Sequence, residues 1–496
     1  MDREILYLLL APTLTGILIF IFGKKSFLSA EGPALLGSAI TFGLSGWIFY
    51  YTTRGRILSF FHEEFRVDAL GGLMVGLVGF LGFIVVIYSI PYMRKEVAEG
   101  VIPSNKIHSY YAWLMLFLAS MLWATTTNDI YLLWVIIEAT TLASIILVSF
   151  NWSREALEAG YKYAMLLTVG ITFALFGCVL LYAGSSPHIA SGLSPLKITE
   201  IAKVAGKIPQ SIALLAVILM LAGFGTKAGI VPFHTWLPDA HAEAPTPVSA
   251  LLSGIMIKVG LYAVIRTVLI FYSFHSIISI LVLILGVMTM IVGIVMMFLQ
   301  DDTKRFLAFC SVVSMGYIFM GLGLGNYLGI YGAIFHLINH SLMKALAFLS
   351  LGGIIYSTRY RKMSDLGGLG KLMPVTAFTF YIAALALSGV PLFNGFVSEF
   401  TIFLAGMKAG HLWATIIAIV VSILTLAAFI QATARIFMGT LPENLIKIKI
   451  REVPIAMWGG EILLAVLCIL IGIYPQVIYP VLHEATKAVF AMMPMP

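Results

Sequence analysis

Charged residues are scarce in this sequence. They make up only 11% of the 496 residues, whereas hydrophobic residues make up 60%. Because a soluble domain carries roughly 25% charged residues, this composition excludes a soluble protein and predicts an all-α, polytopic membrane protein. No long soluble segment separates the apolar runs, so the sequence leaves no room for a catalytic domain outside the membrane.

Cysteine is also scarce. The three cysteines, Cys178, Cys310 and Cys468, each stand alone inside an apolar run. They form no CxxC, haem-attachment or iron–sulfur pattern. We therefore expect no cofactor in this chain and expect any redox cofactor to belong to a partner. The first apolar run lacks a cleavage site of small residues, so we interpret it as a membrane helix and not as a removed signal peptide.

Long apolar runs, by contrast, follow one another along the chain. A membrane-spanning helix needs about 20 apolar residues. We predict fourteen spans, at residues 4–22, 31–51, 68–92, 108–126, 130–150, 157–183, 211–231, 248–272, 276–299, 305–325, 328–356, 374–405 (broken), 411–439 and 455–480. Loops after odd-numbered spans hold more Lys and Arg than loops after even-numbered spans. The positive-inside rule then places both termini on the outer side of the plasma membrane.

Two of the predicted spans are interrupted by proline beside an ionisable residue. Lys227 lies in an apolar run that breaks at Pro232, and Lys258 lies in the next run. A second break, at Pro391, is followed closely by Glu399. A charge inside the membrane costs about 2.5–3.5 kcal/mol even on insertion scales, and transporters build ion sites at broken helices. Two such breaks five spans apart predict paired repeats that are inverted in the membrane.

Ionisable residues also lie in the middle of other spans. Glu138 has no other charge nearby in sequence and is a candidate partner for Lys227. The alternative for Glu138 is a neutral carboxyl bonded to the backbone, and the alternative for Lys227 is a side chain that extends to the interface. Lys258 lies farther from a loop and is a candidate relay group. We expect Arg266, two turns later, to extend to the interface.

His336, His340 and Lys344 recur at intervals of four residues and therefore share one helix face. A zinc site is an alternative for two histidines at this spacing, but the HLINH segment lacks a zincin glutamate and no third ligand is evident. We therefore predict no metal site and favour imidazoles that pass protons. Glu399 is the last acid of the series, and its alternative role is to cap a half-helix at the interface.

Several other charged residues are weaker candidates for a functional role. Lys162 lies about one turn into its span, so an interfacial position and a functional role are both open. The link after the first break contains residues that we interpret as structural or as part of an entry path: His234, Asp239, His241 and Glu243. We expect structural roles for four residues near span ends: Asp68, Asp129, Arg435 and Glu461.

Three segments together resemble a known family. They are KAGIVPFHTWLPDAHAEAPTPVSALLSGIMIK (227–258), HLINHSLMKALAFLSLGG (336–353) and GVPLFNGFVSEF (389–400). They closely resemble the antiporter-like subunits of respiratory complex I, which also occur in Mrp cation/proton antiporters and in membrane-bound hydrogenase-type complexes. The resemblance extends over essentially the whole chain.

The resemblance implies a fourteen-helix fold with broken helices seven and twelve. Its parts would be helices 1–3 (1–107), a first inverted repeat (108–275), a second inverted repeat (276–440) and helix 14 (441–496). It implies that Glu138 pairs with Lys227 and that Lys258 is the central relay. His336, His340 and Lys344 would continue the path to Glu399, a position at which some family members carry lysine. We expect no counterpart of the long lateral helix that the most distal complex I subunit carries.

We hypothesise that the chain moves protons or another cation along a mid-membrane Glu–Lys–Lys–His–Glu axis. It would belong to a membrane redox complex, with further antiporter-like subunits and a peripheral arm that carries iron–sulfur clusters as partners. The first alternative is an Mrp-type Na⁺/H⁺ antiporter component without a redox partner. The second is a structural subunit that does not transport ions. The sequence contains no catalytic centre of its own, and nothing in it calls for a nucleic acid.

Overall fold

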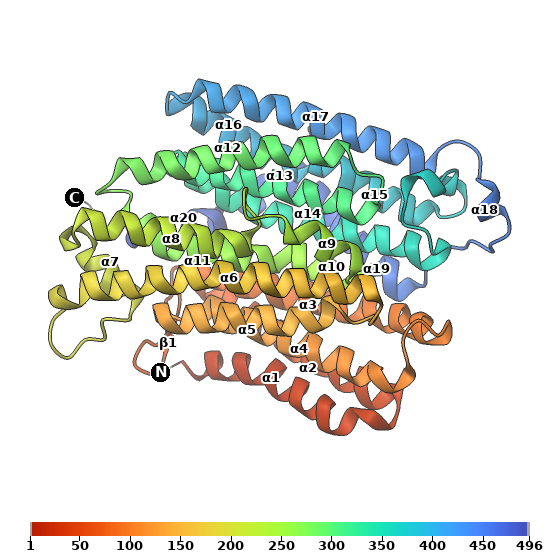
Figure 1. The fold of residues 1–496 in the computed structure, drawn as a ribbon, viewed down its shortest axis with the longest axis horizontal. Helices are drawn as coiled ribbons and strands as arrows, with labels where there is room; N and C mark the ends of the chain where they lie inside the picture. The colour runs from red at the N-terminus through yellow and green to blue at the C-terminus, as the bar shows by residue number, and fades with distance from the viewer. Residues whose placement is uncertain (1, 494–496) are drawn as a thin grey trace.

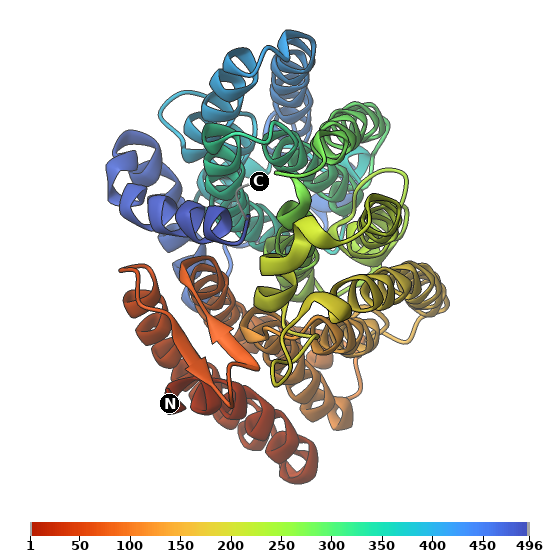
Figure 2. The same cartoon turned by 90° about the vertical axis from the view of Figure 1, so that its left-hand side faces the viewer.

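The computed structural model describes residues 2–493. Its long helices run side by side along one axis, with α1 and α2 at one edge, α17 at the opposite edge and α14 between them (Figure 1). A two-stranded antiparallel hairpin lies across one end of the bundle (Figure 2). The fold is therefore an all-α, polytopic membrane protein, as predicted.

The helices have the lengths that membrane crossing requires. The long ones are α1 (Arg3–Phe22), α2 (Phe27–Thr52), α3 (Ala69–Ala98), α4 (Ile107–Thr126), α5 (Ile130–Val148), α6 (Arg154–Ser185), α8 (Gln210–Ala228), α12 (Ser276–Phe298), α13 (Thr303–Gly323), α14 (Tyr327–Thr358), α17 (Leu412–Phe437) and α19 (Ile455–Ile473). One further span consists of α10 (Thr246–Leu251), a π-helical turn (Leu252–Met256) and α11 (Ile257–Val268). Among the described residues, 13 helices are long and apolar enough to span a membrane.

Shorter elements complete the chain. They are β1 (Leu58–Phe60), β2 (Phe65–Val67), α7 (Ile198–Val204), α9 (Trp236–Glu243), α15 (Pro374–Leu387), α16 (Asn394–Lys408), α18 (Glu443–Ile446) and α20 (Tyr479–Ala491). The pair α15 and α16 forms the broken twelfth span, which completes the fourteen that we predicted. The last predicted span is too long, because α19 ends at Ile473 and α20 follows as a separate helix that packs against α3 and α14.

Both predicted breaks are present. Helix α8 ends at Ala228, and the next residue, Gly229, has φ +74°, a left-handed conformation that ends helices and that glycine adopts without strain. Helix α15 ends at Leu387, and Gly389 has φ +63° in the same way. Lys227 therefore lies in the last turn before the first break, and Glu399 lies in α16 after the second. The assignment of two inverted repeats stays a prediction.

Three of the four charged residues expected near span ends have structural contacts there. Asp68 and Asp129 cap α3 and α5 by accepting hydrogen bonds from backbone N–H groups. Arg435 lies 3.9 Å from Asp301. Glu461 is the seventh residue of α19, which begins at Ile455 as predicted, but it is fully buried and so lies deeper than we expected of an acid near a span end.

The expectation for Arg266 was also wrong. Its guanidinium does not extend to the interface but forms a buried ion pair with Asp68, with 2.5 Å between the nearest nitrogen and oxygen atoms. A charged head in the interior needs a counter-charge, and the cap of α3 supplies one. The first turn of α1 and the last residues of α20 lie at this same end of the bundle, since Asp2 bonds to Ser59 and Met492 contacts Arg266.

The centre of the bundle is formed by the helices that carry the predicted relay residues. In the span Thr246–Phe271 and in α13, every residue of the most apolar 18-residue stretch is buried, and in α14 the buried share of that stretch is 94%. By contrast, α1, α2, α6 and α17 expose one apolar face each, as helices at a lipid boundary do. The ionisable residues of α11 and α14 are therefore separated from lipid by a layer of other helices.

Candidate ion-translocation site

Lys227 begins the site in the last turn of α8. Its side chain is 1% exposed, so it does not extend to the interface. The ammonium donates a hydrogen bond of 2.8 Å to the hydroxyl of Thr141 on α5. It also lies 5.9 Å from the ring centre of Tyr163 on α6, within the range of a cation–π attraction.

Glu138 does not contact Lys227 directly in this structure. One carboxylate oxygen accepts a hydrogen bond of 2.9 Å from Thr168 of α6, and the other has no hydrogen-bond partner among residues 2–493. No ion pair within 4 Å joins Glu138 to Lys227 in the described part of the chain. The direct pairing that we predicted is absent here because each group is held by a different threonine.

Lys258 follows the π-helical turn of the eighth span. Its ammonium donates to the backbone oxygen of Ser253, five residues earlier. The Ser253 hydroxyl in turn lies 2.7 Å from the hydroxyl of Ser311 on α13. A π-helical turn shifts the backbone bonding pattern by one residue and is frequent at functional sites. Here it brings a carbonyl within reach of a fully buried lysine.

The α14 residues lie in the middle of the bundle. The rings of His336 and His340 are stacked, with centres 6.1 Å apart and planes 15° apart. Within residues 2–493 neither nitrogen of the His340 ring has a hydrogen-bond partner. The Lys344 ammonium donates to the backbone oxygen of Leu307 on α13, at 2.8 Å. All three predicted residues are therefore buried on one face of α14, where His336 contacts Tyr317 and Lys344 contacts Leu307 of α13.

Glu399 closes the series on α16. Its side chain is 3% exposed, and one carboxylate oxygen accepts a hydrogen bond of 2.9 Å from Ser422 of α17. The carboxyl therefore lies in the interior and not at the interface. The described chain contains no group of three or more His, Cys, Asp or Glu side chains that could hold a metal ion.

Three polar residues that we did not single out connect His336 to the second break. Asn339 donates to the backbone oxygen of Asn394 at 2.7 Å and to the Ser398 hydroxyl at 3.1 Å. The same hydroxyl lies 3.0 Å from Nδ1 of His336. A signal for them was present, since Asn339 lies between the two histidines of HLINH, and Asn394 and Ser398 lie in the second break motif.

The accessory candidates divide into a surface group and two histidines that lie deeper. Lys162 is half exposed and pairs with Glu158 at 2.8 Å and with Asp239 at 3.7 Å. Asp239 also pairs with Arg305 at 2.5 Å. Lys162 and Asp239 thus belong to a charged surface cluster away from the central residues.

The two histidines of the link lie deeper. His241 is fully buried and its ring is stacked on Phe348 of α14, with 4.8 Å between ring centres. Neither His241 nitrogen has a partner in the described residues. His234 is 9% exposed and packs its ring edge against Phe309. His241 therefore lies beside the face of α14 that carries Lys344, closer to the centre than the sequence indicated.

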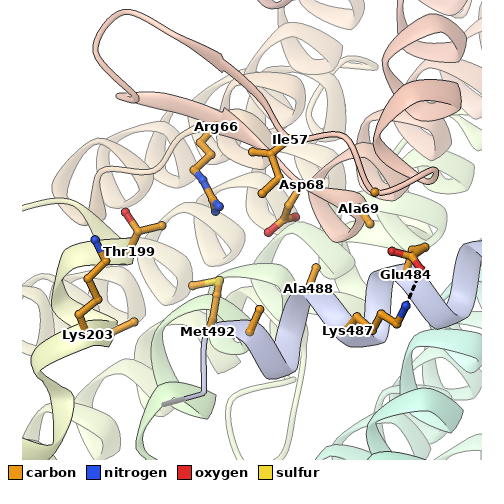
Figure 3. Close-up of a pocket in the computed structure, with 13 residues that line it drawn as sticks. Ile57, Arg66, Asp68, Ala69, Thr199, Lys203, Glu484, Lys487, Ala488 and Met492 are labelled. Carbon is orange, nitrogen blue, oxygen red and sulfur yellow. Dashed lines mark hydrogen bonds and ion pairs between the residues drawn. The ribbon is translucent and has the colours of Figure 1, made fainter. Parts of the chain in front are cut away.

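A pocket at the hairpin end of the bundle lies apart from these residues. Its volume is about 330 Å³, and its lining includes Arg66, Lys203, Glu484 and Lys487 (Figure 3). Glu484 and Lys487 pair with each other within α20. The pocket therefore joins the surfaces of the hairpin, α7 and α20 and contains none of the predicted relay residues.

The chain belongs to the proton-translocating antiporter family of membrane subunits. The family model described as "NADH:quinone oxidoreductase/Mrp antiporter, TM" matches residues 127–425. A second model, described as "NADH-Ubiquinone oxidoreductase (complex I), chain 5 N-terminus", matches residues 61–99. The chain is accordingly an antiporter-like protein of the ion-translocating type, as the resemblance predicted.

Relatives with curated names come from three kinds of membrane complex. The chain is 32% identical over 399 residues to the Hydrogenase-4 component F homolog of Methylacidiphilum infernorum, a match that covers 78% of this chain and 84% of the relative. It is 32% identical to NADH-quinone oxidoreductase subunit N of Desulforudis audaxviator, over 77% of this chain and 74% of the relative. It is 34% identical to a Na(+)/H(+) antiporter subunit of Alkalihalophilus pseudofirmus, but spans only 54% of that protein.

Solved structures share the fold. A chain of the Mrp complex from Dietzia superposes with a TM-score of 0.86 at 21% identity, and covers 100% of both chains. A chain of the archaeal membrane-bound sulfane sulfur reductase gives 0.86 at 24% identity, over 98% of both. A chain of respiratory complex I from Thermus thermophilus gives 0.77 at 22% identity, over 95% of this chain and 98% of that chain.

Proposed function

We propose that this chain carries protons through the membrane along a path from Glu138 to Glu399. The observation that supports the proposal most is the burial of five ionisable side chains between these two carboxyls: Lys227, Lys258, His336, His340 and Lys344. Burial of so many such groups is costly and is seen in membrane proteins mainly along ion pathways. Packing alone would favour apolar residues at these positions.

Lys227 and Glu138 form the switch in this proposal. In the arrangement seen here, Lys227 bonds to Thr141 and Glu138 bonds to Thr168. A neutral hydroxyl compensates a buried ammonium less well than a carboxylate does. Movement of Glu138 onto Lys227 would hold the proton on the lysine, and its withdrawal would release that proton toward Lys258. The titration belongs to the coupled group and not to either residue alone.

The onward path uses α14 and the second break. Imidazole can accept a proton on one nitrogen while it donates from the other. The stacked His336 and His340 therefore can pass a proton between Lys258 and the cluster of Asn339 and Ser398. Glu399 would be the last carrier, and its bond to Ser422 on α17 would hold it in position.

The partners are other membrane subunits, because the structural neighbours are chains of multi-subunit membrane complexes. Glu138 is half-buried and bonds to Thr168 on the exposed face of α6, so this end of the path lies near a surface where a neighbouring protein could act on it. The further parts of the proposal are a peripheral redox arm with iron–sulfur clusters, a plasma-membrane location and termini on the outer side. The names of the hydrogenase-4 and NADH-quinone oxidoreductase relatives support the redox arm.

An Mrp-type Na⁺/H⁺ antiporter component is the second candidate. It is supported by the 34% identity to the Alkalihalophilus pseudofirmus antiporter protein and by the TM-score of 0.86 with a chain of the Mrp complex. The two candidates differ in what drives transport. Transport in the first requires an electron donor and acceptor, whereas transport in the second requires only an ion gradient.

The experiment uses the complex that copurifies with this chain, reconstituted in vesicles with pH-sensitive and sodium-sensitive dyes inside. Lys227→Ala and Glu138→Ala should abolish proton movement, while Lys203→Ala, at an exposed lysine of α7, should leave it unchanged. Proton movement at the wild-type rate in both axis variants would overturn the proposal. Movement driven by an imposed sodium gradient, with no electron donor present, would establish the antiporter alternative.

A further inference from the structure

Glu461 is a buried carboxyl outside the path described above. It lies on the inward face of α19, together with Met457, Leu464 and Cys468, and its side chain is 0% exposed. One carboxylate oxygen accepts a hydrogen bond of 2.8 Å from Thr379 of α15. The other oxygen is buried and has no partner within the described chain. An apolar residue would pack at this position at a lower cost.

Hydroxyl groups from two further helices converge on this carboxyl. Ser350 of α14 donates a hydrogen bond of 2.9 Å to the Thr379 hydroxyl. Tyr88 of α3 lies nearby and donates to the backbone oxygen of Leu349, beside Ser350. No Lys, Arg or His among residues 2–493 forms an ion pair with Glu461. The carboxyl is thus surrounded by groups that both donate and accept protons and not by a counter-charge.

A second carboxyl connects this cluster to the end of the bundle. Glu452 is half-buried in the link before α19 and accepts hydrogen bonds from the backbone N–H of Val375 and from the hydroxyl of Thr376, at 2.8 and 2.5 Å. It therefore sits at the N-terminus of α15, where a negative charge is stabilised. Thr376 and Thr379 are three residues apart and share a face of α15. The Thr376 hydroxyl donates to Glu452, and the Thr379 hydroxyl donates to Glu461 and, at 3.1 Å, to the Thr376 backbone oxygen, so the two threonines lie between the carboxyls.

The inner end of the cluster lies on the helix that carries part of the proposed path. Ser350 follows Lys344 by six residues on α14, which is about 9 Å along the helix and about a third of a turn around it, so Ser350 contacts α15 whereas Lys344 contacts α13. Phe348, which lies between them in sequence, stacks its ring against that of His241. The outer end lies beside the basic loop 357–373, on the side that the positive-inside rule assigns to the cytoplasm.

We propose that Glu461 is a proton-loading carboxyl on a side branch formed by Glu452, Thr376, Thr379 and Ser350. The branch takes a proton from water at Glu452 and passes it through the Thr376 and Thr379 hydroxyls to Glu461, once the Thr379 hydroxyl has rotated from the Thr376 backbone oxygen to the Thr376 hydroxyl. Ser350, which is bonded to Thr379, is the exit of the branch toward α14 and Lys344. No covalent bond other than O–H and N–H bonds forms or breaks, and each hydroxyl receives one proton as it gives one away. The inference rests on the proposed function, since it supplies protons to that path.

The test compares Glu461→Gln with Glu443→Gln in the reconstituted complex. Glu443 is an exposed glutamate of α18 in the same region of the chain. Loss of a positioned proton carrier slows proton transfer by about 100-fold or more, so Glu461→Gln should reduce proton movement by at least about tenfold and Glu443→Gln should not. Thr379→Val keeps the carboxyl but removes the hydroxyl between it and Thr376, and should slow transfer as well. If the Glu461→Gln chain does not assemble into the complex, the proton-movement rate of Thr379→Val decides whether the side branch operates.

Two readouts separate the possible outcomes. If Lys227→Ala abolishes proton movement while Glu461→Gln and Thr379→Val retain the wild-type rate, the side branch is overturned and the main path stands. If Lys227→Ala also moves protons at the wild-type rate, the main path is overturned, and with it the side branch that would supply it. Infrared difference spectra should show a protonated carboxyl band that Glu461→Gln removes. A band that disappears on addition of Na⁺ would instead identify Glu461 as a cation ligand and overturn the proton assignment.

Discussion

Lys227 donates its hydrogen bond to Thr141, and Glu138, one turn earlier on α5, is held by Thr168. The two charged groups that would form the switch are therefore separated by neutral hydroxyls in this structure. Thr141 acts as an alternative partner for the lysine. Its hydroxyl makes the open arrangement accessible, because a buried ammonium with no partner at all would be far less stable.

We predict that Thr141→Val slows proton movement by about tenfold or more. A hydrogen bond to a charged group contributes about 1.5–3 kcal/mol, and its loss would drive Lys227 into a lasting pair with Glu138. The matched control is Thr140→Val, because the Thr140 hydroxyl bonds only to the Ile137 carbonyl of its own helix. Equal proton-movement rates for the two variants in reconstituted vesicles would show that Thr141 has no part in the switch.

The residues of the proposed path could be singled out from the sequence because a charge in an apolar run is conspicuous. Lys258, His340 and Lys344 were predicted to be functional for this reason, and all three are buried. The breaks were equally visible as proline and glycine within apolar segments. What these residues contact could not be predicted, since contacts between helices depend on packing and rotamers that no local pattern encodes. The bond between Glu138 and Thr168 is one such contact.

Glu461 shows a different limit. It follows Pro454 by only seven residues, and with span boundaries uncertain by several residues it was interpreted as a span-end acid. The helix α19 begins at Ile455, as predicted, but the sequence did not show that Glu461 lies on the face that packs against α14 and α15. The π-helical turn before Lys258 was also invisible, because its residues suit an ordinary α-helix. Neither feature has a signature in residue type alone.

Asn339 gives a second prediction. It bonds to the backbone of Asn394 and to Ser398, so Asn339→Ala would leave buried polar groups of the second break without partners. We expect a loss of about 1–3 kcal/mol in the free energy of unfolding and slower proton transfer from His336. The measurements are denaturant unfolding in detergent and proton movement in vesicles.

The matched control for Asn339→Ala is Ser341→Ala. Ser341 is buried on the same helix, but its hydroxyl bonds only to the Leu337 carbonyl one turn earlier. This variant should retain both stability and transport rate. A stability loss in Asn339→Ala without any change in rate would assign the asparagine a structural role only.

The buried pair of Arg266 and Asp68 gives the third prediction. Asp68→Asn removes the counter-charge from a guanidinium that is 6% exposed in its side chain, and breaking such a pair costs about 3–5 kcal/mol. Glu484→Gln breaks a partly exposed pair with Lys487 at the same end of the bundle and should cost less than about 1 kcal/mol. Denaturant unfolding in detergent compares the two.

A double variant, Asp68→Asn with Arg266→Met, removes the unpaired charge and should recover most of the loss. If it does not, the cost of Asp68→Asn comes from the cap of α3 and its bond to Gly71, and not from the stranded arginine.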